Sequence, residues 1–460
     1  MTRSASLALL FVCLLPGCGN DNNSDGPKGP PVAPDAGAQP DAGSIPGPDL
    51  GQVGLDTGSA PLSSQVQSDK PRATSSVVPA ADASQLAADN LAFGVDLHRQ
   101  LGKQNSGNYI FSQTSISLAL AMLYGGAANN TAVQMATALH FSLPPERLHP
   151  TFDALELALM APSSDNGGKA FQLSIANSLW VQSGAVFLPS YLDLLAQDYG
   201  AGLFIEDFVH AYESARGDIN TWVSDHTEQM IPELFPVGSI TPDTRLVLAN
   251  AVYFHGDWLF PFKGGSPKGT FHAATADVSV PMMSSEQSNA SLWSGAGWNA
   301  ASLTYAGGTT SMILLVPDAG TFTAFEQGIT ADSLTAMLSS TQVQTGMVTM
   351  PSFKFATPSS LDTTLKALGM TDAFTPNVAD FSGIDSGRDL SVGTVIHKAV
   401  IAVDEKGTTA AAATGVTVGI TSVITPPTKL LVVDRPFLFF IRHAQTGAIL
   451  FQGRVTDPTQ

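Results

Sequence analysis

Apolar segments of strand length dominate the second half of the chain, whereas helical patterns come first. An apolar stripe predicts an amphipathic helix from Leu86 to Lys103, and another predicts a helix capped by Ser112 or Ser115. Because strands and helices do not alternate as βαβ units, we predict an α+β fold with large, mainly antiparallel sheets. The predicted strands are Phe171 to Val181, Leu246 to Phe254, Thr309 to Val316, Gly346 to Phe355, Leu430 to Val433, Phe437 to Arg442 and Ala448 to Val455.

The amino terminus is typical of an export signal. Arg3 gives a positive start, and the apolar run Leu7 to Leu15 is shorter than the about 20 residues that span a bilayer. The Leu-Pro-Gly-Cys sequence ending at Cys18 resembles a bacterial lipoprotein signal, although its proline replaces the usual small residue. We expect a signal over 1–17 and a lipid on Cys18 that anchors the protein at the bacterial cell envelope, on the outer membrane or surface. An ordinary secretory signal, giving an extracellular protein, is the alternative.

The composition changes after the signal. From 18 to 85, Pro, Gly, Asp and Ala dominate, and aromatic residues are absent. Such a segment buries too little surface to offset its ordering entropy. We therefore predict a disordered tether over 18–85 and one folded domain over 86–460.

Charge and cysteine content exclude several classes of function. With 39 acidic and 21 basic side chains the formal charge is −18, which disfavours nucleic acid and heparin-like partners. Cys13 and Cys18 are the two cysteines of the chain. The body therefore has no disulfide, cysteine-based zinc site, iron–sulfur cluster or cysteine nucleophile.

Motifs of catalysis are missing from the sequence. It contains no Gly-x-Ser-x-Gly, no His-Glu-x-x-His and no Gly-Lys-Ser/Thr loop, and its nine histidines lack the spacing of metal ligands. Gly295 to Ala300 matches a loose dinucleotide pattern, but a simple turn explains it better because no strand–turn–helix surrounds it. We predict that the protein is not an enzyme and needs neither a cofactor nor a metal.

The segment from Glu405 to Pro427 has a pattern of its own. After Lys406 it is uncharged and made mostly of Ala, Thr, Gly and Val. Every second residue from Thr408 onward would lie on one face of a strand, and this face becomes apolar and β-branched toward its far end, as in a strand that packs on a core. The four successive alanines, however, make a poor autonomous strand. The segment could be a switch between loop and strand, or a plain flexible linker. The residues of this face are Thr408, Ala410, Ala412, Thr414, Val416, Val418 and Ile420.

This segment resembles the hinge and reactive-centre loop of the serpins, whose pattern is Glu-x-Gly-Thr followed by small residues. Tyr109 to Ile116 resembles the family's Phe-Ser-Pro-x-Ser-Ile segment, with Gln113 in place of the proline. Leu248 to Trp258 resembles Asn-x-x-Tyr-Phe-x-Gly-x-Trp. The resemblance covers about residues 86–460 as one domain. Further stretches match in order: Ala121 to Ala127, Thr131 to Met135, Leu368 to Phe374, Ala379 to Ile384, His397 to Ala399 and Asp434 to Arg442.

The resemblance implies a fold and a mechanism. The serpin fold has three β-sheets, eight or nine helices and an exposed reactive-centre loop, here about residues 405–428, above a metastable central sheet. Serpins are suicide inhibitors of serine proteases. The target cleaves the loop and becomes acylated, and the freed hinge then inserts as a strand and drags the protease across the molecule. The implied partner is a protease in a covalent complex, and the inhibitor is expected to be a monomer.

Single residues inherit roles from this resemblance. Glu405 would end the fixed strand, and Gly407 would give the turn its backbone freedom. Thr408, Ala410, Ala412 and Thr414 would be the first inward side chains of the inserted strand. Ser112, Ser115, Asn250 and His397 match the polar cluster called the shutter, beneath the sheet. Trp258 matches the tryptophan of the breach, where the loop first enters.

The scissile bond is assigned by counting. Counting from Glu405 gives Thr421–Ser422, whereas counting back from Pro436 lands near Thr425, so Ile420–Thr421 and Ser422–Val423 remain rivals. Since Gly407 to Thr428 contains no Arg or Lys, we expect elastase-like or subtilisin-like targets. Two alternatives stay open: a non-inhibitory serpin that acts as a surface binding protein, and an inhibitor of cysteine proteases.

Overall fold

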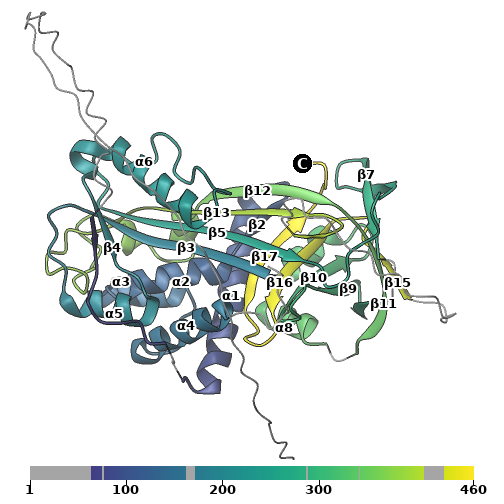
Figure 1. Cartoon of the computed structure of the whole chain (residues 1–460), viewed down its shortest axis with the longest axis horizontal. Helices are drawn as coiled ribbons and strands as arrows, with labels where there is room; N and C mark the ends of the chain where they lie inside the picture. The colour runs from purple at the N-terminus through teal and green to yellow at the C-terminus, as the bar shows by residue number, and fades with distance from the viewer. Residues whose placement is uncertain (1–63, 75–76, 162–170, 286–288, 341, 409–428) are drawn as a thin grey trace, which may run out of the picture. The chain divides into compact units, whose positions relative to one another are not determined.

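A seven-stranded sheet runs through the centre of the molecule. The computed structural model describes residues 64–74, 77–161, 171–285, 289–340, 342–408 and 429–460. The strand order of this central sheet is β1-β4-β3-β5-β14-β13-β12 (Figure 1). The strands are β1 (Ser64–Val66), β4 (Leu203–Glu206), β3 (Phe171–Gln182), β5 (Leu246–Asp257), β14 (Gly407–Thr408), β13 (Val392–Val403) and β12 (Phe353–Ser360).

A seam in this sheet separates β5 from β13. The two strands pair directly and in parallel from Val392↔Leu246 to Ala399↔Val252, whereas their other long neighbours, β3 and β12, are antiparallel to them. At the far end of the seam, the short strand β14 lies between β5 and β13 and pairs with both. The sheet is therefore closed along most of its length and open at one end.

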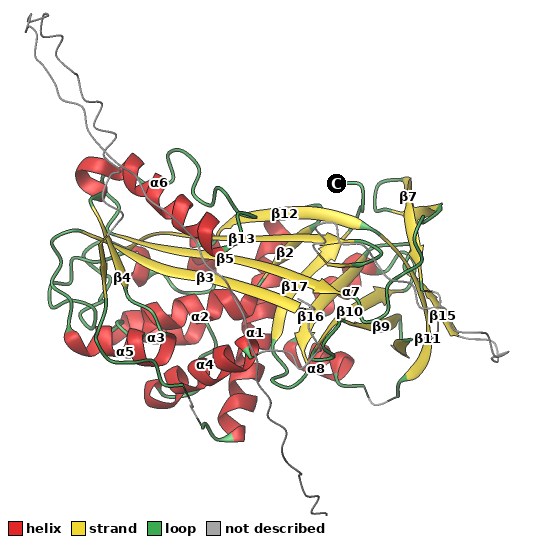
Figure 2. Ribbon diagram, in the orientation of Figure 1, coloured by secondary structure: helices red, strands yellow, loops and turns green. Residues whose placement is uncertain are grey.

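Alternating side chains bury both faces of the central sheet. Leu246 and Leu248 of β5 pack in a core with α1 and α2, whereas Val247 and Ala249 pack in another core with α6. The ribbon shows α6 over one face of the sheet and α1 and α2 on the other (Figure 2). The described residues form nine α-helices, none of them long and apolar enough to cross a membrane. They are α1 (Ala80–Gln104), α2 (Gln113–Tyr124), α3 (Asn129–Ala138), α4 (Pro145–Met160), α5 (Pro189–Tyr199), α6 (Phe208–His226), α7 (Phe322–Gly328), α8 (Ala331–Leu338) and α9 (Asp362–Ala367).

The second sheet has ten strands, nine of them in the order β2-β17-β16-β10-β9-β8-β11-β7-β6, with β15 paired to β11 off this path. The expected third sheet is continuous with it, because β11 pairs with both β8 and β7. The predicted strand Gly346 to Phe355 is two strands that break at Ser352, and the Gly295 to Ala300 pattern spans the tight turn between β8 and β9. The strands are β2 (Tyr109–Phe111), β6 (Lys268–His272), β7 (Asp277–Ser284), β8 (Ala290–Gly295), β9 (Trp298–Thr304), β10 (Thr310–Pro317), β11 (Gln344–Pro351), β15 (Lys429–Val432), β16 (Phe437–His443) and β17 (Ile449–Val455).

The folded part begins earlier than the predicted boundary at residue 86. Helix α1 starts at Ala80, and β1 adds to the edge of the central sheet through Ser64↔Ile205 and Val66↔Leu203. Between them, Arg72 donates to Asp153 (2.8 Å) and Glu156 (2.5 Å) on α4. The prediction of a disordered tether is thus wrong for the described residues before 86, because edge pairing, ion pairs and the first turns of α1 hold this segment in the fold.

Replacing Arg72 by Ala is expected to lower the free energy of unfolding by about 3 kcal/mol, because it leaves two buried carboxylates without their cation. The matched control is Lys70→Ala, which removes a pair with Asp193 whose lysine side chain is 50% exposed and should cost at most about 1 kcal/mol. Urea unfolding of both variants checks this. Equal midpoints would mean that Arg72 contributes no more than a surface ion pair.

Candidate functional site

The hinge is a tight turn that follows β13. The strand ends at Val403, so Glu405 lies inside the turn rather than at the strand end, where we had expected it. Asp404 shapes the turn: its carboxylate accepts hydrogen bonds from the backbone N–H of Lys406 (2.8 Å) and Gly407 (3.1 Å), and its own N–H donates to the Gly407 carbonyl (2.9 Å). The chain is thereby reversed within a few residues and enters the sheet beside the strand it has just left.

The first residues of the expected loop already lie inside the sheet. Thr408 pairs with Val403 on one side and with Gly256 on the other, both antiparallel. Gly407 is needed for close approach, because a Cβ there would lie 2.2 Å from the carbonyl oxygen of Gly256. Its φ is outside the positive range, which corrects the expectation that this glycine provides turn freedom.

Thr408 points inward, as expected, and is 1% exposed. Its hydroxyl forms a 2.7 Å hydrogen bond with the Tyr305 hydroxyl, in surroundings whose burial raises the pKa of Tyr305. The Tyr305 ring stacks on Trp258, with ring centroids 4.5 Å apart and an angle of 10°. Tyr305 carried no sequence signal for this role, since it lies more than a hundred positions from the hinge in β-rich sequence.

Trp258 does more than pack in the core. Its indole N–H donates to the Asp404 carbonyl (3.0 Å), and its backbone N–H donates to the Lys406 carbonyl (2.7 Å). Ser266 donates to the Glu405 carboxylate (2.7 Å), and this hydrogen bond lowers the pKa of Glu405. Trp258 and Ser266 therefore hold both the backbone and the acidic side chain of the hinge turn.

The four predicted shutter residues meet at the middle of the seam. His397 of β13 and Asn250 of β5 face each other across it, and the His397 Nδ1 and Asn250 Oδ1 atoms are hydrogen bonded. The Asn250 amide nitrogen donates to the Ser115 hydroxyl (2.8 Å), and the Ser112 N–H donates to His397 Nε2 (3.2 Å). Ser112, one of the two candidate caps, also caps α2 by accepting from the Ser115 N–H (3.1 Å).

Asn177 extends this cluster onto β3, which sequence reasoning missed. It pairs with Asn250 in the sheet register, and its side-chain oxygen accepts from Asn250 (2.5 Å) and Ser115 (3.3 Å). The row Asn177, Asn250, His397 crosses three strands. The sequence signals Asn177 only as an asparagine within an otherwise strand-like segment. This signal does not identify the residues that Asn177 contacts.

His397 is neutral, with its proton on Nδ1. Because Nε2 accepts from the Ser112 backbone, Nδ1 must donate to Asn250. The ring is fully buried, and desolvation lowers the pKa of His397 to about 3. A second proton would also place a donor on Nε2 against the Ser112 N–H.

Acidification is therefore expected to weaken the native state. The unfolded chain takes up a proton on His397 below its ordinary pKa of 6.5, and the folded chain does so only near 3, so stability falls as the pH drops from about 6.5. At about pH 5 the loss from this group is about 2 kcal/mol relative to about pH 7.5. His149, whose pKa burial lowers to about 4, adds in the same direction. Urea unfolding at both pH values checks this, and a His397→Gln variant should show a smaller difference.

Several predicted residues lie outside the described part of the chain. They are the hinge residues Ala410, Ala412 and Thr414, the scissile-bond candidates Ile420, Thr421, Ser422, Val423 and Thr425, and the lipidation site Cys18. Within the described ranges, no three His, Cys, Asp or Glu side chains are grouped so that they could hold a metal. The arrangement can accept a further strand between β5 and β13. Such a strand would enter beside Trp258 and Tyr305, and the polar row of Asn177, Asn250 and His397 holds the rest of the seam closed.

The chain matches a protein-family model and known proteins over most of its length. The family model "Serpin (serine protease inhibitor)" matches residues 88–458. Serpin B6 of Pongo abelii is 37% identical over 384 residues, which cover 81% of this chain and 99% of the relative. Leukocyte elastase inhibitor of Homo sapiens is 35% identical over 386 residues, covering 81% of this chain and 100% of the relative.

Solved structures agree with the sequence relatives. Uncleaved ovalbumin matches with a TM-score of 0.71 and 27% identity, covering 81% of this chain and 100% of that chain. Human thyroxine-binding globulin, solved with thyroxine, matches with a TM-score of 0.72 and 27% identity, covering 82% and 100%.

Proposed function

The chain belongs to the serpin family, and we propose that it inhibits serine proteases as a suicide substrate cleaved at Thr421–Ser422. The observation that carries this proposal is the position of β14, which already lies between β5 and β13 and starts the strand that insertion would complete. Relatives named as leukocyte elastase inhibitors support the inhibitory role.

The chemical step proceeds on the protease. Its catalytic serine attacks the carbonyl carbon of Thr421, and the bond from that carbon to the Ser422 nitrogen breaks. Ser422 leaves as an amine that takes up the proton, and Thr421 remains as an ester on the serine. The inhibitor must then insert its strand before water cleaves the ester.

The sheet geometry favours insertion once the loop is cut. The direct β5–β13 ladder is parallel, whereas β14 is antiparallel to both strands. Insertion therefore replaces one parallel ladder by two antiparallel ladders, which are slightly more stable per residue. Each new backbone hydrogen bond contributes about 0.5–1.5 kcal/mol.

The shutter lies on the β5–β13 ladder that insertion must separate. Six residues beyond Thr408, Thr414 would reach His397 on one side and Asn250 on the other, by continuation of both ladders. The hydrogen bond between these two side chains has to break, and the Thr414 hydroxyl can replace the partner that each loses. The row thus opposes opening and accepts the inserted strand.

The loop composition supports a target that cuts after small or β-branched residues. A panel of proteases tests this: after incubation, elastase-like and subtilisin-like enzymes should lose activity, and trypsin-like enzymes should retain it. Loss of activity in trypsin-like enzymes alone would contradict the assigned specificity. Including cysteine proteases in the panel decides whether the same trap serves that class.

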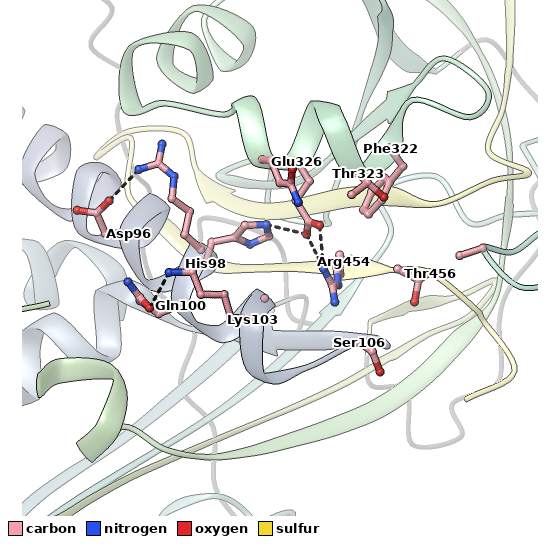
Figure 3. A pocket seen from close by; sticks show the side chains of 14 residues that line it. Asp96, His98, Gln100, Lys103, Ser106, Phe322, Thr323, Glu326, Arg454 and Thr456 are labelled. Atoms are coloured by element: carbon pink, nitrogen blue, oxygen red, sulfur yellow. Dashed lines mark hydrogen bonds and ion pairs between the residues drawn. The ribbon is translucent and has the colours of Figure 1, made fainter. Parts of the chain in front are cut away.

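A second candidate function is ligand binding by a non-inhibitory serpin. A cavity of about 620 Å³, a size typical of ligand sites, lies among α1, α7 and the end of β17 (Figure 3). Glu326 lines it and bridges His98 (3.0 Å) and Arg454 (2.8 Å). Cleavage of the loop by every protease of the panel, without loss of protease activity, would support this ligand-binding function over inhibition.

We also propose export and lipid attachment at Cys18, on the basis of the signal-like amino terminus. Expression in a bacterial host followed by membrane fractionation tests this. The wild-type chain should sediment with membranes, and Cys18→Ser should move it to the soluble fraction. An equal distribution of both would contradict anchoring.

A further inference from the structure

A second cavity lies among four helices and shares no lining residue with the cavity of Figure 3. Its volume is about 320 Å³, at the lower end of the range of small-ligand sites. The carboxyl ends of α2 and α5, the start of α3 and the first half of α4 line it, and these helices lie together on one side of the central sheet (Figure 1). No described residue of the hinge or the shutter lines it, so it is a site of its own.

The charge of this cavity is negative. Glu146 and Asp198 line it, no described Lys or Arg does, and within the described ranges neither carboxylate has an ion pair with a basic side chain. Helices α2 and α5 have their carboxyl ends at its wall, and such ends carry a partial negative charge. Glu146 offsets the positive amino end of α4. Burial, and to a smaller extent the nearby Asp153, raise the pKa of Asp198, because its charged form lacks a counter-ion.

His149 adds a hydrogen-bond donor that has no acceptor. Its ring is 3% exposed, and burial lowers the pKa of His149 to about 4, so the ring is neutral at neutral pH. The Tyr199 hydroxyl keeps its proton, since burial raises the pKa of Tyr199, and it makes one hydrogen bond among the described residues, to His149 Nδ1 (2.6 Å). Tyr199 therefore donates to Nδ1, and the ring proton lies on Nε2. Nε2 is buried and has no partner among the described residues.

We propose that this cavity binds a small organic amine that carries a hydroxyl or carbonyl oxygen beside its ammonium group. The ammonium group would pair with Asp198 and Glu146, and the oxygen would accept the hydrogen bond from His149 Nε2. The half-buried ring of Tyr124, whose centroid lies 6.2 Å from that of His149, would pack against the apolar body of the ligand.

Leu194 controls access to the His149 ring. A Cβ on Gly125 would lie 3.0 Å from Leu194 Cδ2 and 3.3 Å from His149 Cε1, so the leucine side chain borders the ring at this glycine. Leu194 is half-buried and lines the cavity. A change of its rotamer uncovers Nε2 for the ligand oxygen without any movement of the helices.

Calorimetric titration of the full chain at neutral pH tests the ligand class, with phenylethanolamine as the probe. It should bind saturably at one site. Phenethylamine, which lacks the hydroxyl, should bind about fivefold more weakly, because one neutral hydrogen bond is lost. Styrene glycol, in which a hydroxyl replaces the ammonium group, should bind at least about tenfold more weakly, because the charge-assisted pairs are lost.

Two variants assign the binding to this cavity. Asp198→Asn keeps the shape of the side chain and should weaken phenylethanolamine binding at least about tenfold. Its matched control is Asp225→Asn, which removes the same charge at an exposed position on α6 outside the cavity and should bind as the wild type does. His149→Phe keeps a ring but no donor, so it should bind phenylethanolamine and phenethylamine equally well. Urea unfolding verifies that each variant is folded.

The proposal is overturned if phenylethanolamine shows no saturable binding at millimolar concentration, or if styrene glycol binds equally well. It is also overturned if Asp225→Asn weakens binding as much as Asp198→Asn, which would indicate general attraction to an acidic protein, or if His149→Phe still prefers the hydroxylated amine. These titrations need no protease and no cut in the loop. Their outcome is therefore independent of whether the chain traps proteases.

Discussion

Replacing Thr408 by Arg should convert the inhibitor into a substrate. Thr408 is buried between β5 and β13, and its hydroxyl bonds to Tyr305, a partner that offers no negative charge. An arginine there should keep β14 out of the sheet in the uncut protein, so that insertion has to bury the guanidinium at a cost of several kcal/mol, and each 1.4 kcal/mol slows insertion about tenfold. Hydrolysis of the acyl-enzyme then outpaces insertion. Gel electrophoresis in SDS should show a cut loop, active protease and no stable complex.

Thr408→Ser is the matched control, because serine keeps the hydroxyl and adds no charge. It should still trap the protease, with nearly the wild-type number of inhibitor molecules consumed per protease. Full trapping by Thr408→Arg would mean that the first inward position is not desolvated during insertion.

Replacing Asn250 by Ala should cause the largest loss of stability within the shutter. The Asn250 side chain bonds to His397, Ser115 and Asn177, and all of these bonds are lost together. Each buried group left without a partner costs about 1–3 kcal/mol, so the free energy of unfolding should fall by about 3 kcal/mol or more. Urea unfolding measures this change.

The same variant should also lose inhibitory activity faster on storage. Because the bond between Asn250 and His397 crosses the seam, its removal eases opening without a cut. Asn177→Ala is the control, since Asn177 lies on β3, away from the seam. Equal storage lifetimes for Asn250→Ala and Asn177→Ala would argue that the bond between Asn250 and His397 does not hold the seam closed.

The sequence allowed the elements and the inward residues of the hinge to be predicted, but not their partners. Thr408 is expected to point inward because successive side chains of a strand alternate between its two faces, and this alternation can be followed along the sequence alone. Its hydrogen bond to Tyr305 depends on how two sheets meet, which no spacing encodes. Likewise Gly407 was correctly singled out for the wrong reason, since the close approach of the Gly256 carbonyl appears only when β5 and β14 are paired.

Composition misled the prediction at the amino-terminal boundary. The segment before residue 86 has the polar, Pro-rich character of a tether, and apolar periodicity is the main signal by which folded sequence is recognised. Arg72 is fixed instead by two carboxylates on α4, and β1 by the free edge of β4. Such contacts depend on a surface that is formed by residues far away in the chain.

The central claim is that cleavage of the loop leaves the protease covalently attached to a strand inserted at the seam. Intact-mass measurement of the product with an elastase-like protease tests it most directly. We predict one adduct that contains the protease and the inhibitor through Thr421, with the fragment from Ser422 to Gln460 present as a separate mass after denaturation. A cleaved inhibitor and a free, active protease, with no adduct, would contradict the claim.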